Sequence, residues 1–198
     1  MSDFAHTPVM VDEIVELFAP VPAGLLVDAT VGGGGHAEAL LSAHDHLTLL
    51  GLDRDEDALA ATAARLAPFG DRVALRHTRF DHLAEAVQDL GVDEVSGVLC
   101  DLGVSSPQLD RPERGFSYRS DAPLDMRMDR TQERTVADVV NGWDEVALAD
   151  LLRDAGGERY ARPIARAIVA ARPIERTDEL AEIVRNALPA AARRKGGD

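Results

Sequence analysis

The chain is short of the residues on which several classes of protein depend. Its 198 residues include a single cysteine, Cys100, which excludes a disulfide framework and a cysteine metal site, so no metal is expected. Because Cys100 lies in an apolar run, we expect a small, buried side chain there. No apolar run approaches the roughly 20 residues that cross a bilayer, and no signal peptide is recognisable. We therefore expect a cytoplasmic protein with no membrane partner.

Positive charge is also scarce, and it is unevenly distributed. Residues 1–100 contain 5 arginines against 17 acidic residues, whereas residues 101–198 contain 16 basic against 18 acidic residues. This asymmetry predicts two parts with different partners. The acidic half suits a cationic small molecule. The arginines of the second half can hold phosphates bidentately, although about half of them are expected to be solvated or ion-paired.

Apolar runs alternate with segments of helical spacing through the first hundred residues. This order predicts parallel βαβ units, and hence an α/β protein with a doubly wound, mostly parallel sheet. Ligands of such sheets bind beyond the carboxyl ends of the strands. The predicted strands are residues 25–28, 47–53, 73–75 running on toward residue 80, and 95–101; the predicted helices are residues 9–18, 37–43, 57–66 and 83–90.

Four consecutive glycines, Gly32–Gly35, connect the first predicted strand to the following helix. Glycine permits positive φ and lets the backbone approach a ligand without interference from a Cβ atom. Asp53 ends the second strand, where a carboxylate can accept hydrogen bonds from both hydroxyls of a ribose. The two features together predict a cofactor that contains a nucleoside.

The glycine pattern leaves alternatives open. Gly32, Gly34 and Ala37 also match the G-x-G-x-x-A pattern of nicotinamide and flavin proteins, and a plain tight turn is the simplest alternative. The acidic residues 55–57 are interpreted as the first turn of the next helix rather than as ligands.

The alternation stops after Asp101. Residues 105–130 are rich in Pro, Gly, Ser, Asp and Arg and are predicted to form a long irregular loop of the kind that is functional or disordered. Four helices are predicted after it, over residues 136–140, 145–155, 160–171 and 178–187.

Several long motifs carry a more specific signal. The central ones are DLGVSSPQLD (Asp101–Asp110), RGFSY (Arg114–Tyr118) and PLDMRMD (Pro123–Asp129); HTPVM (His6–Met10) precedes them and GERYA (Gly157–Ala161) follows. In this order, from His6 to about residue 189, the chain closely resembles the bacterial 16S rRNA cytosine-N4 methyltransferases, the RsmH or MraW family.

The resemblance implies a Rossmann-like methyltransferase that depends on S-adenosylmethionine (SAM), with an α-helical insertion domain after the fourth strand. Residues 1–106 would be the SAM-binding domain, and residues 107–198 the loop and helical insertion on the RNA side. The implied reaction is methylation of N4 of a cytosine in the decoding region of 16S rRNA, within the small ribosomal subunit. No DNA partner is expected, and the oligomeric state is left open.

The resemblance also assigns residues to the cofactor. Asp53 is expected on the ribose, Phe80 beside the adenine, and Asp101 and Gln108 toward the methionine end. From residue type alone, Phe80 at a strand end would be expected in the core, and His36 would be a loop residue near a helix N-terminus. The cofactor-binding residues implied by the resemblance are Gly34, Gly35, His36, Asp53, Phe80, Asp101 and Gln108.

The catalytic residue is left open. A hydrogen-bond acceptor near the cytosine amino group would localise its lone pair and help to remove its proton. Asp101 or a carbonyl near Ser105 and Ser106 are the candidates. Arg111, Arg114 and Arg127 are expected to contact RNA phosphates, so that reversing their charge would weaken RNA binding.

Two other functional classes compete with this interpretation. A nicotinamide-dependent oxidoreductase would bind a dinucleotide on a similar core, and a non-catalytic RNA-binding or assembly protein would bind RNA without transferring methyl groups. The low basicity of the chain argues against a free-standing RNA binder.

Members of the family that the chain resembles are longer, with further strands after the helical insertion. The sequence, which ends at Asp198, therefore predicts an incomplete sheet whose fourth strand has an open flank. We expect such a chain to bind its cofactor weakly or not at all, to transfer methyl groups poorly, and to associate through the open edge.

Overall fold

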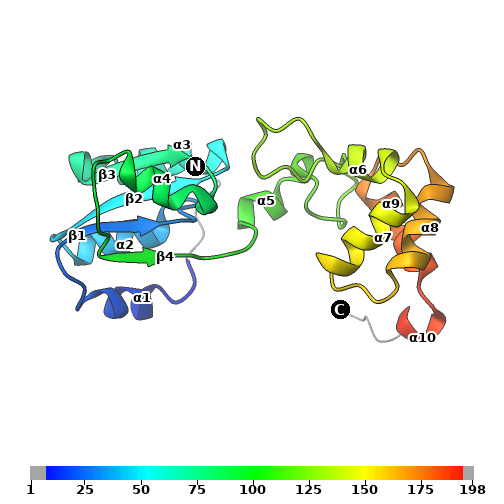
Figure 1. Cartoon of the computed structure of the whole chain (residues 1–198), viewed down its shortest axis with the longest axis horizontal. Helices are drawn as coiled ribbons and strands as arrows, with labels where there is room; N and C mark the ends of the chain where they lie inside the picture. The colour runs from blue at the N-terminus through cyan, green and yellow to red at the C-terminus, as the bar shows by residue number, and fades with distance from the viewer. Residues whose placement is uncertain (1–7, 194–198) are drawn as a thin grey trace. The chain divides into compact units, whose positions relative to one another are not determined.

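The computed structural model describes residues 8–193 (Figure 1). His6 and Thr7 of the HTPVM motif and the last residues of the chain lie outside them. The described residues form two compact units, and we treat each unit by itself. The first contains the residues up to Pro107 together with Met128–Arg130, and the second contains Gln108–Arg127 and the residues from Thr131 onward. No helix within residues 8–193 is long and apolar enough to cross a bilayer.

The first unit is built on a four-stranded sheet in the order β3-β2-β1-β4. Every strand pair in it is parallel, which confirms the predicted α/β class. The strands are β1 (Gly24–Asp28), β2 (Leu47–Asp53), β3 (Val73–His77) and β4 (Gly97–Leu99).

Helices cover both faces of this sheet. Successive side chains of a strand point to opposite faces, so the apolar strands place side chains on both faces, where helices bury them. On β1, Leu26 packs with helices α1 (Val11–Phe18), α2 (Gly35–Ala43) and α3 (Glu56–Leu66). Its neighbours on β1 belong to the core on the opposite face, under α4 (Leu83–Gln88). Two 3-10 segments, η1 (Ala67–Arg72) and η2 (Phe80–His82), flank β3. Burial on both faces explains the nearly continuous apolar runs of β1 and β2.

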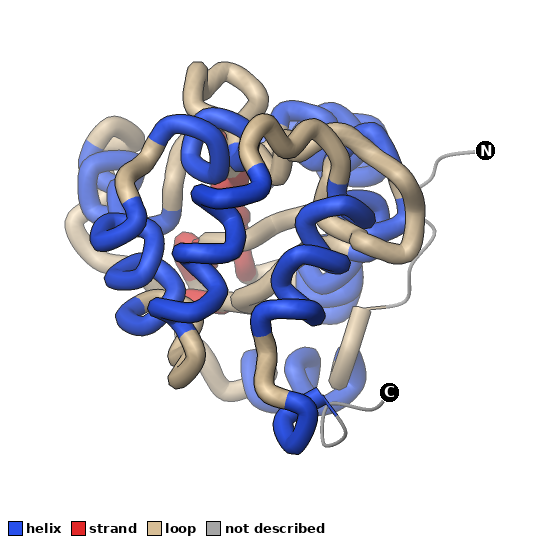
Figure 2. Tube along the Cα trace, turned by 90° about the vertical axis from the view of Figure 1, so that its right-hand side faces the viewer, coloured by secondary structure: helices blue, strands red, loops and turns tan. Residues whose placement is uncertain are grey.

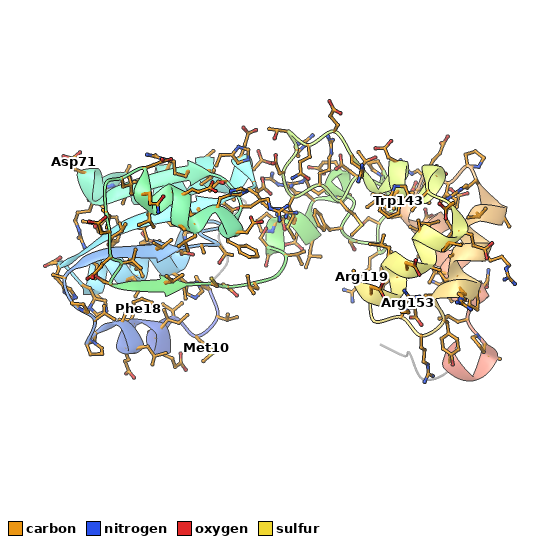
Figure 3. The ribbon with its side chains drawn as sticks, viewed as in Figure 1. Met10, Phe18, Asp71, Arg119, Trp143 and Arg153 are labelled. Carbon is orange, nitrogen blue, oxygen red and sulfur yellow. The ribbon has the colours of Figure 1, made fainter. Side chains whose placement is uncertain are left out.

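β4 is an edge strand and is shorter than the predicted 95–101, because it pairs with β1 at only three positions. In the described part of the chain no strand lies on its outer side, and Val98 is 45% exposed. One face of β4 is closed by Phe18, which lies beneath it in Figure 3. A Cβ atom on Gly97 would come within 2.7 Å of the Phe18 ring, so this glycine admits the close approach of α1.

The second unit consists of helices and loops in the residues described (Figure 2). Its main core is formed by apolar side chains of several helices, with Ile164, Ala165 and Ile168 at its centre. Side-chain caps start two of the helices, Thr135 at α6 and Asp144 at α7. The helices are α6 (Val136–Gly142), α7 (Glu145–Asp154), α8 (Ala161–Ala171), α9 (Thr177–Ala187) and the short α10 (Ala190–Arg193).

The segment predicted as an irregular loop, residues 105–130, contains regular structure, so that prediction is wrong in part. A short helix, α5 (Ser106–Asp110), and a 3-10 turn, η3 (Pro112–Arg114), lie within it. Both have a proline in their first turn, where the missing N–H costs nothing and the fixed φ suits a helix.

Asn141 joins α6 to the chain that follows α8. Its side-chain amide donates to the carbonyl of Ile174 (2.8 Å), and its side-chain oxygen accepts from the N–H of Ile174 (2.9 Å). Ile174 is fully buried. Asn141→Ala should therefore lower the free energy of unfolding of the second unit by about 1–3 kcal/mol, because two buried polar groups lose their partner.

Urea unfolding followed by the fluorescence of Trp143, the only tryptophan, measures this effect within the second unit. Asn186→Ala, an exposed position on α9, is the matched control. Equal stability of the Asn141→Ala variant and the parent would contradict the assignment.

Candidate functional site

Three carboxylates meet at the carboxyl edge of the sheet. Asp28 ends β1 and is paired in register with Gly51 on one side and Leu99 on the other. Asp53 and Asp101 each follow those partners by two residues. The predicted strands 25–28, 47–53 and 95–101 each end on one of these residues, and the observed register brings the three together at one edge.

Asp28 is the most deeply buried of the three. It is 2% exposed, and its Oδ1 accepts a hydrogen bond from the N–H of Thr30 at 3.2 Å. Burial raises the pKa of Asp28 to about 7; the hydrogen bond from Thr30 opposes the rise, and the charges of Asp53 and Asp101 add to it. The site therefore contains a carboxyl group that is half-protonated near neutral pH.

Asp53 holds the glycine loop in place. Its two side-chain oxygens accept hydrogen bonds from the N–H groups of Gly32 and Asp55, each at 2.9 Å. Burial raises the pKa of Asp53, and these two hydrogen bonds oppose the rise. A carboxylate has about four acceptor positions, so the side chain keeps capacity for the hydroxyls of a ribose.

Asp101 is exposed at the end of β4, and its backbone is fixed by the loop that follows β1. Its N–H donates to Oγ1 of Thr30 at 2.7 Å. Thr30 thus contacts Asp101 through its side chain and Asp28 through its N–H. One threonine therefore sets the spacing of two of the three acidic residues.

The glycine loop has the conformation that its sequence predicts. Gly32 and Gly34 have φ values of +51° and +78°, in the region that favours glycine. Thr62 of α3 is hydrogen-bonded to the loop. Its side chain is fully buried, and its hydroxyl donates to the carbonyl of Gly32 at 2.6 Å. A Cβ atom on Gly34 would lie 3.1 Å from the methyl group of Thr62.

His36 lies in the first turn of α2 and is 7% exposed. Its Nε2 is 2.8 Å from the carbonyl oxygen of Val9. A carbonyl oxygen can only accept, so Nε2 carries a proton and donates it to the protein. His36 is therefore more than a loop residue, and any cofactor contact through the rest of the residue stays a prediction.

The structure corrects two expectations about burial. Phe80 begins the 3-10 turn η2 and is 51% exposed, so the alternative that placed it in the core is wrong. Cys100 is exposed as well, because β4 ends one residue before it. An exposed phenylalanine at this edge is available to an adenine face.

The remaining predicted residue, Gln108, belongs to the second unit. It lies in α5 and is 6% exposed. Its role toward the cofactor stays a prediction. No group of three or more histidine, cysteine or acidic side chains that could hold a metal occurs among residues 8–193.

These features fit a cofactor that joins a nucleoside to a positively charged group. The acidic side chains provide negative potential for a cation and acceptors for a ribose, while the glycine loop lets the backbone come close. Sequence reasoning did not assign Asp28 to the site, although it saw the residue at a strand end. Sequence reasoning missed Thr30 and Thr62 entirely. A threonine in a loop or in an alanine-rich helix carries no pattern that indicates a functional role.

Comparisons with known proteins point to one family. The MraW methylase family matches residues 3–198. A curated relative from Thermobifida fusca, named ribosomal RNA small subunit methyltransferase H, is 54% identical over 98% of this chain and 60% of its own length. Relatives of the same name from Symbiobacterium thermophilum and Mycolicibacterium smegmatis are 53% and 52% identical, over 98% of this chain and 62% and 55% of their own. The chain thus spans about three fifths of the length of the curated relatives it matches.

The raised pKa of Asp28 predicts a pH-dependent stability difference. Its folded pKa of about 7 lies above the ordinary 3.8, so the folded state favours the protonated form and loses stability as the pH rises from about 4 to 7. Asp28→Asn removes that loss. The free energy of unfolding of the variant should equal that of the parent below about pH 4. Above pH 7 it should exceed that of the parent by up to about 4 kcal/mol.

Amide hydrogen exchange of β1, measured from pH 4.5 to 8, gives the free energy of opening of the first unit. Asp45→Asn, whose side chain is fully exposed, controls for the loss of one negative charge. A difference between Asp28→Asn and parent that does not change with pH would show that Asp28 is ionised throughout.

Proposed function

Because the chain belongs to the MraW methylase family, as its motifs indicated, we propose that its first unit binds SAM. We further propose that the protein methylates N4 of a cytosine in the decoding region of 16S rRNA, within the small ribosomal subunit in the cytoplasm. The observation that carries the cofactor part is the cluster of Asp28, Asp53 and Asp101 beside a glycine loop. The names of the relatives support the ribosomal substrate.

The chain contributes position and proton acceptance to this reaction. Bound SAM supplies a methyl group carried on a positively charged sulfur. Alignment of the acceptor nitrogen with that group can lower the barrier by up to roughly 7–11 kcal/mol, and the target base must be unstacked to reach it. When N4 takes the methyl group, the bond from the methyl carbon to sulfur breaks, the sulfur leaves as a neutral thioether, and N4 loses a proton. The exposed carboxylate of Asp101 can take up this proton, whereas a carbonyl near Ser105 and Ser106 would accept a hydrogen bond from the amino group while the proton leaves to solvent.

The second unit supplies the RNA side in this proposal, but one of the three arginines first expected there, Arg114, is buried; phosphate contacts through Arg111 and Arg127 stay predictions. Arg114 is 3% exposed and donates to the carbonyl of Arg127 at 3.0 Å. Arg127 is held by both oxygens of Asp125 and by the carbonyl of Gln132. The expectation that Arg114 meets a phosphate is therefore wrong, because its guanidinium is buried in the loop.

Exposed residues at the end of the RGFSY motif are better placed for RNA. Tyr118 is 66% exposed, and the neighbouring Arg119 is exposed as well (Figure 3). An exposed aromatic ring can stack on an unpaired base, and an arginine can hold a phosphate. We propose Tyr118 and Arg119 as RNA contacts.

Removal of the Asp53 carboxylate should weaken cofactor binding. Asp53→Ala loses both the hydroxyl acceptor and the bond to Gly32, which should raise the Kd for SAM about 5- to 150-fold, or about 1–3 kcal/mol. Calorimetry with SAM and with its demethylated product measures this change, and Asp45→Ala controls for charge. Unchanged affinity would remove Asp53 from the site. Binding of a nicotinamide dinucleotide instead of SAM would favour the oxidoreductase.

Loss of one RNA phosphate contact should show in the salt dependence of binding. Arg119→Ala should weaken binding of the small ribosomal subunit and lower the slope of log affinity against log salt by about 1, with cofactor affinity unchanged. Arg153→Ala is the matched control, since Arg153 is an exposed arginine paired with Asp150 and Asp154. Equal salt slopes for the two variants would contradict the role of Arg119.

The activity itself is tested by product analysis. Ribosomal RNA incubated with the protein and SAM, then digested and analysed by mass spectrometry, should contain N4-methylcytidine. RNA binding without this product would favour a non-catalytic RNA-binding protein.

A further inference from the structure

Three histidines bind the same stretch of backbone. The Nε2 atoms of His36, His44 and His46 lie 2.8, 2.9 and 3.2 Å from the carbonyl oxygens of Val9, Val15 and Val21. Each ring nitrogen faces an acceptor and therefore donates. Helix α1 and the residues on either side of it are thus attached by side chains to α2, to its C-terminal cap and to the residue before β2.

His36 differs from the other two in where it stands. It follows Gly35 directly, at the point where the glycine loop becomes α2. His44 is the C-terminal cap of that helix, nine residues after Gly35 and at the opposite end of α2. His36 is therefore the histidine of the three that joins the N-terminal segment to the predicted cofactor loop.

A second contact lies beside it. A Cβ atom on Gly35 would come within 2.3 Å of Cγ of Pro8, so the ring of Pro8 rests directly on the backbone of Gly35. We call residues 8–10 the strap. The strap ends at Met10, which has a left-handed φ of 55° and whose carbonyl accepts the first hydrogen bond of α1, from Ile14. Met10 precedes the first residue of α1, and its side chain is 63% exposed (Figure 3).

The two ends of the glycine loop, Gly32 and Gly35, are held by different contacts. Asp53 and Thr62 hold its first residue, Gly32, through the N–H and the carbonyl. Glycines at positive φ lose much conformational freedom when they are fixed, and binding is weakened whenever the ligand has to order them. The strap lies on Gly35, the last residue of the loop.

We propose that His36 is a positioning residue: by donating to Val9 it clamps the strap on Gly35 and keeps the glycine loop ordered for its cofactor. Its ring contributes to binding through the strap and contacts no ligand. The ligand is taken to be SAM, so this inference rests on the proposed function.

Four variants separate clamping from ligand contact. His36→Ala removes the clamp, and His36→Gln restores an N–H donor at a similar reach. Pro8→Ala shortens the side chain that rests on Gly35 and leaves His36 intact. His44→Ala is the matched control, because it removes the same kind of bond from the same segment at the far end of α2.

Two measurements are made on each variant: the Kd for S-adenosylhomocysteine, and the hydrogen exchange of the glycine-loop amides without ligand. His36→Ala should weaken binding about tenfold, as for one lost hydrogen bond, and speed exchange in the loop. Pro8→Ala should change both in the same direction by less. His36→Gln and His44→Ala should stay within about threefold of the parent in affinity, with loop exchange unchanged.

The inference is overturned if His36→Ala and His44→Ala have equal effects on loop exchange. It is also overturned if His36→Gln binds as weakly as His36→Ala while its loop exchanges like the parent, because the ring would then contact the ligand itself. If the parent does not bind the ligand, the proposed function fails, and the exchange measurement still decides whether His36 orders the loop.

Discussion

The rest of the site depends on the two hydrogen bonds that the Asp53 carboxylate accepts from the N–H groups of Gly32 and Asp55. It links the end of β2 to the loop after β1, and so turns two neighbouring strand ends into one surface. Thr62 adds a bond to the carbonyl of Gly32 from α3. Without these bonds, glycines that are free to adopt many conformations would have to be ordered by the ligand.

The clustered carboxylates of this surface make ionisation of Asp28 unfavourable, and a cationic ligand can offset this cost. Burial and the charges of Asp53 and Asp101 hold the pKa of Asp28 at about 7, so its ionised form is disfavoured in the folded protein. A positive charge bound nearby would favour ionisation and release a proton. Cation affinity and the protonation of Asp28 are therefore coupled, and a neutral nucleoside lacks this contribution.

The sequence predicted the sheet well because each of its signals is local. Strands buried on both faces leave apolar runs, and the acidic residues at their ends fall at one edge once the strands are parallel. The supporting contacts were not predictable in the same way. The bond from Thr62 to Gly32 and the bond from His36 to Val9 span 30 and 27 residues, and nothing in the local pattern around Thr62 or His36 specifies its partner. The exposure of Cys100 followed from the early end of β4, an edge effect that an apolar run does not reveal.

The arginines of the second unit show why residue type alone misleads about partners. The motifs RGFSY and PLDMRMD look like two separate recognition elements, yet they fold against each other. The N–H of Met126 donates to the carbonyl of Arg114, and a Cβ atom on Gly115 would lie 2.4 Å from the carbonyl oxygen of Pro123. Arg114 donates to the carbonyl of Arg127 in a buried position, where a lysine could not offer the same planar set of donors. The two motifs therefore build a fixed base, and the exposed Tyr118, at the end of RGFSY, and Arg119 after it are the residues proposed to meet RNA.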